Sequence, residues 1–189
     1  MLVGLMSDTH DNLPMIDRAV RRLNEMNVEL VLHAGDYVAG FSVPRLSELK
    51  SRLIGVFGNN DGDHEFLKRR FNEFGLDMRG IFAEVKADGL RIALLHGGES
   101  GSPPGPSELL TSLLGSESYD VLVYGHSHDA KAYKNGEMLI IVPSAEKNPL
   151  RLVNTTNGFS RRLYPVAGAD LSASTVRYQT GEGFSVKEP

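Results

Sequence analysis

The chain has 189 residues and no cysteine, with 41% hydrophobic and 23% charged residues, a composition typical of a globular protein in which we expect one domain over residues 1–189. The lack of cysteine excludes disulfides and thiol catalysis. No apolar run approaches the ~18 residues of a membrane span, so we expect a cytoplasmic protein without a membrane partner. The net charge of -4 argues against nucleic acid as a partner, and we interpret the pairs Arg21-Arg22, Arg69-Arg70 and Arg161-Arg162 as solvent-exposed faces.

The first third of the chain alternates strands and helices. Continuous apolar runs predict three strands buried on both faces, at Leu2–Met6, Leu30–Leu32 and Leu53–Phe57. Apolar residues at helical spacing predict a helix over 14–27 with Asn12 as its cap, a short helix over 44–50, and another from about residue 63. This order implies a largely parallel sheet.

The middle of the chain is dominated by hairpins. Asp88-Gly89 and Asn135-Gly136 are two-residue turn signals, each between apolar runs. The first turn joins predicted strands at Phe82–Ala87 and Arg91–Leu95, and the second joins strands at Lys131–Lys134 and Met138–Val142. Val121–Tyr124 is predicted as a strand between the two hairpins. A helix is predicted over Ser107–Leu114, and a third hairpin over Thr175–Gln179 and Phe184–Lys187.

Polar clusters follow five of the predicted strands. They are Ser7–His10, His33–Asp36, Gly58–Asp61, His96–Gly98 and Gly125–His128. Each cluster alone is compatible with an ordinary turn, and His33 is better explained as a packed histidine at a strand end than as a ligand. Together they place two aspartates, one asparagine and four histidines at strand ends, where open α/β sheets bind ligands. Independent turns have no reason to do this, and the set suits two neighbouring metal ions that clamp a phosphoryl group.

These motifs, in this order, resemble the calcineurin-like metallophosphoesterase superfamily. The motifs are Asp8-Thr9-His10, Gly35-Asp36, Gly58-Asn59-Asn60-Asp61, His96-Gly97 and Gly125-His126-Ser127-His128. The short chain resembles the small prokaryotic phosphodiesterase branch, and the resemblance covers residues 1–142, leaving 143–189 as a divergent tail. It implies an α/β fold, a four-layer αββα sandwich of two mixed β-sheets flanked by helices.

The resemblance also implies the ligands. One ion would be held by Asp8, His10 and His128, a second by Asn59, His96 and His126, with Asp36 bridging both. A hydroxide between the ions would attack phosphorus in line, which makes Asp36, Asn59, Asp61 and His126 the catalytic candidates. Asp61 would orient a histidine ligand, and Asn59 and Asn60 would contact the substrate phosphate. We expect two divalent transition-metal ions, Mn first, with Ni, Fe, Co or Zn also compatible.

Three departures from the family pattern stand out. Asn60 occupies the position at which many relatives have a histidine that can protonate the leaving group. Gly98 replaces a second histidine, and the following Gly/Pro-rich stretch over 97–105 is either a connecting loop or a flap that shapes the substrate pocket. Val142-Pro143-Ser144-Ala145 replaces the usual Asn-Pro-Gly. The family pattern therefore gives no prediction for the strands that follow and close the sheet.

The substrate expected from this reading is a small phosphodiester. A phosphomonoester or nucleotide remains an alternative, and so does a non-catalytic metal-binding scaffold for protein interaction. Such a scaffold loses metal ligands, whereas this chain has all seven, which favours an enzyme. Whether the protein forms a homo-oligomer is left open by the sequence.

Overall fold

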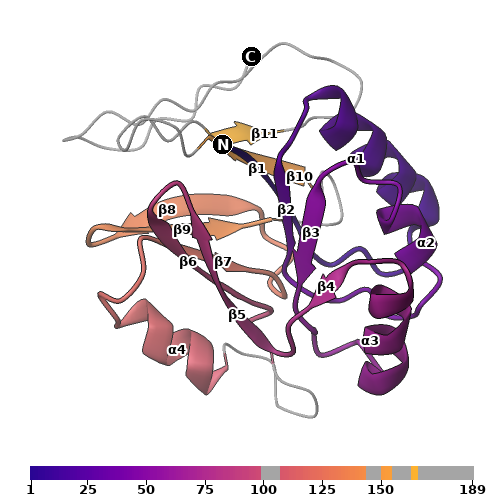
Figure 1. Cartoon of the computed structure of the whole chain (residues 1–189). Helices are drawn as coiled ribbons and strands as arrows, with labels where there is room; N and C mark the ends of the chain where they lie inside the picture. The colour runs from indigo at the N-terminus through magenta and orange to yellow at the C-terminus, as the bar shows by residue number, and fades with distance from the viewer. Residues whose placement is uncertain (99–106, 144–149, 155–162, 166–189) are drawn as a thin grey trace.

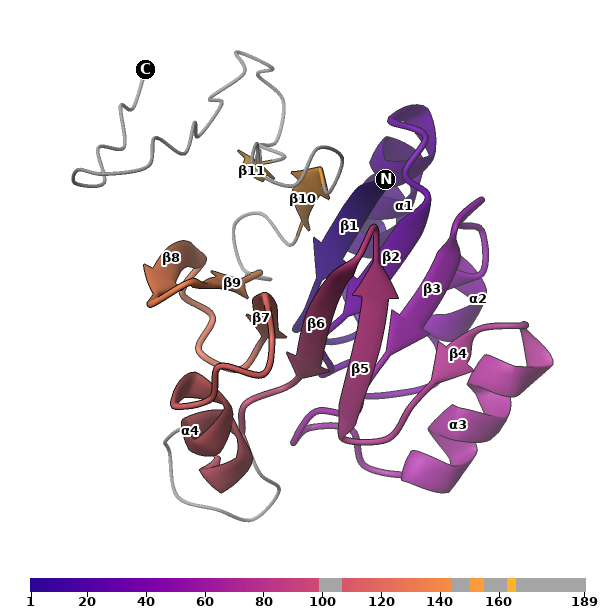
Figure 2. The same ribbon diagram turned by 60° about the vertical axis from the view of Figure 1, so that its left-hand side comes forward.

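Two β-sheets lie face to face, and helices cover their outer faces (Figures 1 and 2). The computed structural model describes residues 1–98, 107–143, 150–154 and 163–165. Helices α1 (Leu13–Glu25), α2 (Val43–Leu46) and α3 (His64–Glu73) cover the first sheet, and α4 (Glu108–Leu114) covers the second. The expected αββα sandwich is therefore confirmed.

The first sheet has six strands, of which four are parallel. Its spatial order is β11 (Leu163–Pro165), β10 (Leu150–Asn154), β1 (Leu2–Met6), β2 (Leu30–His33), β3 (Arg52–Gly55) and β4 (Asp77–Met78). Strands β1 to β4 run parallel, and β10 and β11 add to the β1 edge in antiparallel fashion. Because parallel strands point the same way, the loops that follow β1, β2 and β3 meet at one edge of the sheet.

In the part of the chain that the structure describes, the second sheet has five strands and contains the hairpins predicted at Asp88-Gly89 and Asn135-Gly136. Its order is β5 (Phe82–Ala87), β6 (Leu90–Leu95), β7 (Val121–Tyr124), β9 (Met138–Val142) and β8 (Lys131–Asn135). Both residues of the Asp88-Gly89 turn have positive φ, 47° and 79°, as a type I′ turn requires. Strands β6, β7 and β9 are parallel, so their carboxyl ends also meet at one edge.

The alternation of side chains along each strand builds three apolar layers. In β1, Val3 and Leu5 pack between the sheets, whereas Met6 packs under the helices. In β9, Leu139 and Ile141 join the layer between the sheets, and Ile140 packs towards α4. These strands are buried on both faces, which explains their continuous apolar sequences.

Several element boundaries differ from the predictions. Helix α2 ends at Leu46, short of the predicted residue 50, and the chain continues through Leu49 in single turns. Strand β3 ends at Gly55, because the next two N–H groups donate to His33 and Gly80 outside the regular ladder. Strands β4, β10 and β11 have two to five residues and no distinctive apolar pattern. The third predicted hairpin, over 175–187, lies outside the described residues.

Among the helices that the structure describes, none is long and apolar enough to span a bilayer.

Candidate metal centre

The candidate site lies where the carboxyl ends of five strands from both sheets converge. The first sheet contributes the loops after β1, β2 and β3, and the second contributes those after β6 and β7. The structure brings together all seven predicted ligands, namely Asp8, His10, Asp36, Asn59, His96, His126 and His128. They fall into two neighbouring groups linked by Asp36.

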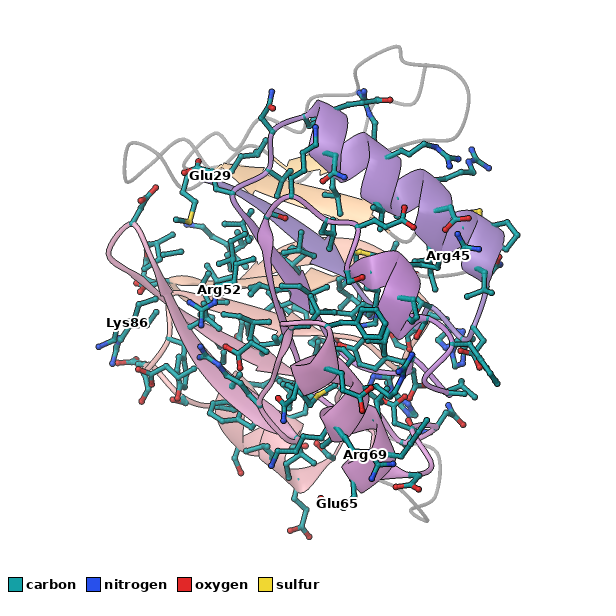
Figure 3. All side chains as sticks on the ribbon, turned by 45° about the vertical axis from the view of Figure 1, so that its right-hand side comes forward. Glu29, Arg45, Arg52, Glu65, Arg69 and Lys86 are labelled. Carbon is teal, nitrogen blue, oxygen red and sulfur yellow. The ribbon has the colours of Figure 1, made fainter. Side chains whose placement is uncertain are left out.

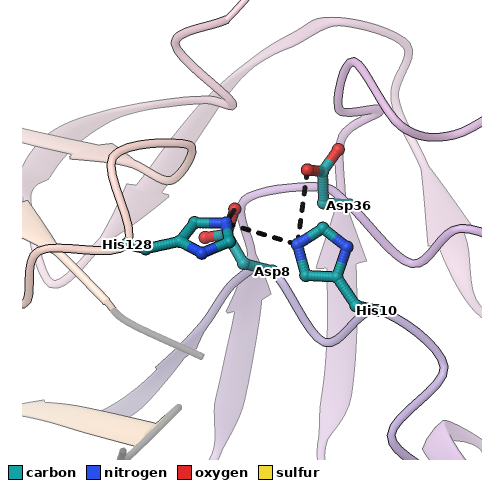
Figure 4. A group of neighbouring side chains, drawn as sticks. All are labelled: Asp8, His10, Asp36 and His128. Atoms are coloured by element: carbon teal, nitrogen blue, oxygen red, sulfur yellow. Dashed lines mark hydrogen bonds and ion pairs between the residues drawn. The ribbon is translucent and has the colours of Figure 1, made fainter. Parts of the chain in front are cut away.

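The first group consists of Asp8, His10, Asp36 and His128, which point towards one another (Figure 4). One potential ligand atom from each lies within 4.8 Å of the others. His10 Nε2 is 3.3 Å from His128 Nε2 and 3.6 Å from Asp36 Oδ2, and His128 Nε2 is 3.3 Å from Asp8 Oδ1. Two imidazole nitrogens and two carboxylates that face one point form a donor set for a divalent cation.

The second group is centred on Asn59. Its Oδ1 lies 2.9 Å from His96 Nε2 and 2.8 Å from His126 Nδ1. His96 Nε2 is also 3.3 Å from Asp36 Oδ2, which joins this group to the first. Amide oxygen, carboxylate oxygen and two ring nitrogens again converge.

The tautomer of His96 indicates that positive charge belongs in this group. His96 Nδ1 lies 2.8 Å from the carbonyl oxygen of Ala34, which can only accept, so Nδ1 carries a proton. In a neutral ring the Nε2 lone pair then faces the oxygens of Asn59 and Asp36, an arrangement that repels unless a proton or a metal ion lies between them. The donor set therefore fits a metal ion.

Buried carboxylates make the centre strongly electronegative. Asp8 and Asp36 are both 0% exposed, and an uncompensated charge at such a depth is costly. Burial raises the pKa of Asp36, but hydrogen bonds and charge from His96 and hydrogen bonds from Asn60 outweigh it and hold that pKa far below its usual range. Burial lowers the pKa of His96, yet the carboxylates of Asp36 and Asp8 raise it overall. The rise at His96 reflects the negative charge of Asp36 and Asp8 at this point.

The ligands sit on backbone that non-glycine residues rarely adopt. The φ angles of Asp8, His10, Asp36, His126 and His128 are 54°, 42°, 61°, 72° and 54°. Clusters of left-handed residues are typical of functional sites, where surrounding structure holds them in place. The loop after β1 runs beside the loop after β2, with the N–H groups of Asp8 and His10 donating to the carbonyls of Gly35 and Asp36.

Asp61 has a different contact from the one expected. Its carboxylate accepts four backbone N–H groups, from Asp36 at 3.1 Å, Tyr37 at 2.7 Å, Val38 at 2.8 Å and Gly58 at 2.7 Å. The expected contact with a histidine ligand is therefore replaced, among the described residues, by bonds to the loops after β2 and β3. Burial raises the pKa of Asp61, and these N–H groups lower it in part.

Asn60 lies against the carboxylate of Asp36. Its backbone N–H donates to Asp36 Oδ1 at 2.8 Å and its side-chain Nδ2 donates to Oδ2 at 2.6 Å. The amide thus faces the centre.

His33 is packed in the core, as expected. It is 0% exposed, its ring stacks on Tyr37 with 4.0 Å between the centroids, and its Nε2 lies 3.2 Å from Thr9 Oγ1. Burial, reinforced by the nearby His96, lowers its pKa to about 3, so the ring is neutral.

Two supporting residues had no assigned role in the sequence. Ser7 donates its hydroxyl to Asp8 and also lies 3.0 Å from the carbonyl of Pro143. At Gly125 a Cβ atom would lie 2.8 Å from Asp8 Oδ2 and 3.0 Å from His96 Nδ1, so the ligands leave no room for a side chain. In the sequence, the feature that could have indicated these supporting roles is that Ser7 and Gly125 directly precede Asp8 and His126.

Comparison with known proteins agrees with this geometry. Residues 1–155 match the calcineurin-like phosphoesterase superfamily domain, so the match extends past Val142 and includes β10. The phosphodiesterase MJ0936 of Methanocaldococcus jannaschii is 34% identical over 144 residues, which cover 76% of this chain and 82% of that protein.

Solved structures show the same fold. One described as a novel archaeal phosphodiesterase has a TM-score of 0.73 and 31% identity, covering 82% of this chain and 94% of that one. Vps29 of Entamoeba histolytica, solved in complex with zinc, has a TM-score of 0.64 and 20% identity, covering 94% of this chain and 98% of that one, and shows the fold alone. The chain belongs to the calcineurin-like phosphoesterase superfamily, a class of hydrolases that act on phosphate esters.

Proposed function

We propose that this protein is a phosphodiesterase with a binuclear metal centre between its two sheets. The observation that carries the proposal is the pair of ligand groups that share Asp36, one with two imidazoles and a carboxylate, the other with two imidazoles and an amide oxygen. The net reaction adds water to a phosphodiester, breaks one P–O ester bond and releases an alcohol and a phosphomonoester.

The residues divide between the two ions. Asp8, His10 and His128 would hold one ion, Asn59, His96 and His126 the other, and Asp36 would bridge them. Two ions held in this way lower the pKa of a bound water and neutralise charge on phosphoryl oxygens. The ligand set contains oxygen and nitrogen and no sulfur, which suits Mn and is compatible with Ni, Fe, Co or Zn.

The remaining site residues position this set and the substrate. Asp61 anchors the backbone on both sides of the bridging position, so it keeps Asp36 where both groups can use it. The Ala34 carbonyl fixes the His96 ring. We propose that the Asn60 side chain, together with Asn59, donates to a phosphoryl oxygen when substrate binds, since an amide NH2 is a suitable donor.

A phosphodiester preference is supported by the name of the archaeal relative at 34% identity. The scaffold alternative draws on the likeness to Vps29, which at 20% identity concerns the fold alone. The convergence of all seven candidate ligands in two adjacent groups favours catalysis, because two neighbouring ions are the arrangement that phosphoryl transfer uses. We also propose that the whole chain forms one domain, although the family match ends at residue 155.

Hydrolysis assays test this proposal. Metal-stripped protein would be supplied with Mn, Ni or Zn and given bis(p-nitrophenyl) phosphate or p-nitrophenyl phosphate. We expect metal-dependent turnover, faster with the diester, that His128→Ala lowers by at least about tenfold. His64→Ala is the matched control, because His64 stacks on Phe57 outside the two ligand groups. Stoichiometric metal binding without turnover of either ester would refute the proposal in favour of the scaffold.

A further inference from the structure

A pocket of about 610 Å³ lies beside the candidate metal centre, between the loop after β2 and helix α3. It is lined by Val38 and Phe41 from the loop and by Phe66, Leu67 and Arg69 from the helix. Among the described residues, five large hydrophobic side chains are exposed, and Val38, Phe41 and Phe66 are three of them. Exposed apolar groups that gather at one cavity mark a binding surface.

The pocket is continuous with the candidate metal centre along the chain. Val38 follows the bridging Asp36 by two residues, so their Cα atoms are at most about 8 Å apart. The N–H of Val38 donates to the same Asp61 carboxylate that holds the backbone of Asp36. Asp63, also in the lining, follows Asp61 by two residues. The wall of the pocket therefore begins within about 8 Å of the backbone of Asp36.

The apolar wall is held in place by its surroundings. Val38 has φ of 77°, a conformation that strains a β-branched residue by about 1–3 kcal/mol and persists only where neighbours hold it. Gly40 lets the loop pack closely on α3, since a Cβ atom there would lie 2.7 Å from Phe66 Cε1. The pocket is thus largely formed before any ligand binds.

Two carboxylates and two arginines line the pocket, namely Asp63, Glu73, Arg69 and Arg70, and among the described residues Arg69 is the one of these two arginines that makes no ion pair. Its guanidinium lies 5.4 Å from the centre of the Phe66 ring. Figure 3 labels Arg69 on helix α3. The neighbouring Arg70 is paired with Glu73 at 2.8 Å, and Asp63 is engaged as the cap of α3. The pair Arg69-Arg70, predicted to be a solvent-exposed face, thus contributes a cation beside an aromatic ring. Such a pair suits a flat aromatic group attached to an anion.

We propose that this pocket binds a flat aromatic group, such as a nucleobase or aryl ring, on the ester that the phosphodiester retains after hydrolysis. This inference rests on the proposed function. In-line displacement puts the leaving group opposite the attacking oxygen, and the retained ester lies to the side of that axis, which is the position we assign to this pocket. Phe41 and Phe66 supply the stacking faces, and Arg69 supplies the cation.

Three diesters that share p-nitrophenol as leaving group test the proposal, with methyl, phenyl or thymidine-5′ as the retained group. Phe66→Ala and the more exposed Phe41→Ala should lower kcat/KM for the aromatic esters by about tenfold to a hundredfold and change the methyl ester less than twofold. Phe74→Ala is the matched control. Phe74 is 38% exposed against 40% for Phe66 and also lies under an arginine, Arg70 at 4.7 Å, yet it is outside the pocket lining.

A response of either aromatic ester alone identifies the retained group as aryl or nucleoside and supports the proposal. Equal losses for all three esters, or none, would overturn it. A calorimetric titration of metal-stripped protein with phenyl phosphate, thymidine 5′-monophosphate and methyl phosphate separates this inference from the proposed function. The pocket is supported, even if no ester is hydrolysed, when the wild type binds either aromatic phosphate more tightly than methyl phosphate and this difference is lost in Phe66→Ala and kept in Phe74→Ala. Equal binding of all three phosphates by the wild type refutes the proposal.

Discussion

Replacing Asp61 by asparagine removes one of two acceptor oxygens from the loops that carry the bridging ligand. The Asp61 side chain is 4% exposed, and each of its oxygens accepts two backbone N–H groups. In Asp61→Asn the new NH2 group is a donor facing two N–H donors, whichever way the amide turns. Two buried N–H groups then lose their acceptor.

The magnitude follows from this count. A buried donor left without a partner costs about 1–3 kcal/mol, so two cost about 2–6 kcal/mol. Removing the charge also relieves repulsion between Asp61 and Asp36, which offsets part of the loss. We expect a net decrease of about 2–4 kcal/mol in the free energy of unfolding, a large fraction of the 5–15 kcal/mol of a typical domain.

Urea unfolding in the presence of chelator measures this loss without any contribution from bound metal. Asp63→Asn is the control, because Asp63 caps α3 by accepting the N–H of Phe66 at 2.8 Å and asparagine caps equally well. An Asp61→Asn variant within 0.5 kcal/mol of the wild type would refute the role given to this carboxylate. We further expect the metal affinity of the variant to fall, since Asp36 loses part of its anchor.

Three other predictions follow from single positions. Gly98→Ala should reduce the amount of bound metal and lower turnover, since its Cβ atom would clash with the His126 ring. Gly62→Ala is the control, because no atom lies within 4 Å of its Cβ atom, and it should leave both quantities unchanged. Equal effects of the two variants in metal analysis and kinetics would refute this reasoning. The pKa of His33 is about 3 in the folded protein and 6.5 in the unfolded chain, so the free energy of unfolding is unaffected above pH 6.5 and falls as the pH drops towards 3. The expected loss at pH 5, measured in chelator, is about 2 kcal/mol. His33→Gln should remove this part of the dependence of the free energy of unfolding on pH, and an unchanged dependence would contradict the prediction. Because Asn60 cannot protonate a leaving group, kcat/KM should fall steeply as the pKa of the leaving group rises. Asn60→His should raise the rates for poor leaving groups by up to about a hundredfold. A kcat/KM that does not depend on the leaving-group pKa, with chemistry rate-limiting, would argue against this.

The main elements of the fold were predictable from local pattern. Continuous apolar runs identified β1, β2, β7 and β9, and Asp-Gly and Asn-Gly turns identified the hairpins. The two-residue β4 and the closing strands β10 and β11 were not predicted, because they exist through pairing with distant strands. Strand β10 runs beside β1 with Met6 opposite Leu150, a contact across more than 140 residues that no local pattern encodes.

The sequence by itself determined which residues are the candidate ligands. Asp8, His10, Asp36, Asn59 and the later histidines could be selected because each follows a strand, and parallel strands end at a common edge. What only the tertiary structure decided is how the backbone presents them. The left-handed turns at these ligands and the four bonds to Asp61 arise because loops from different strands share hydrogen bonds. The pocket beside the centre has the same origin, since Phe41 and Phe66 meet there through packing at Gly40, a contact between segments that local sequence does not relate.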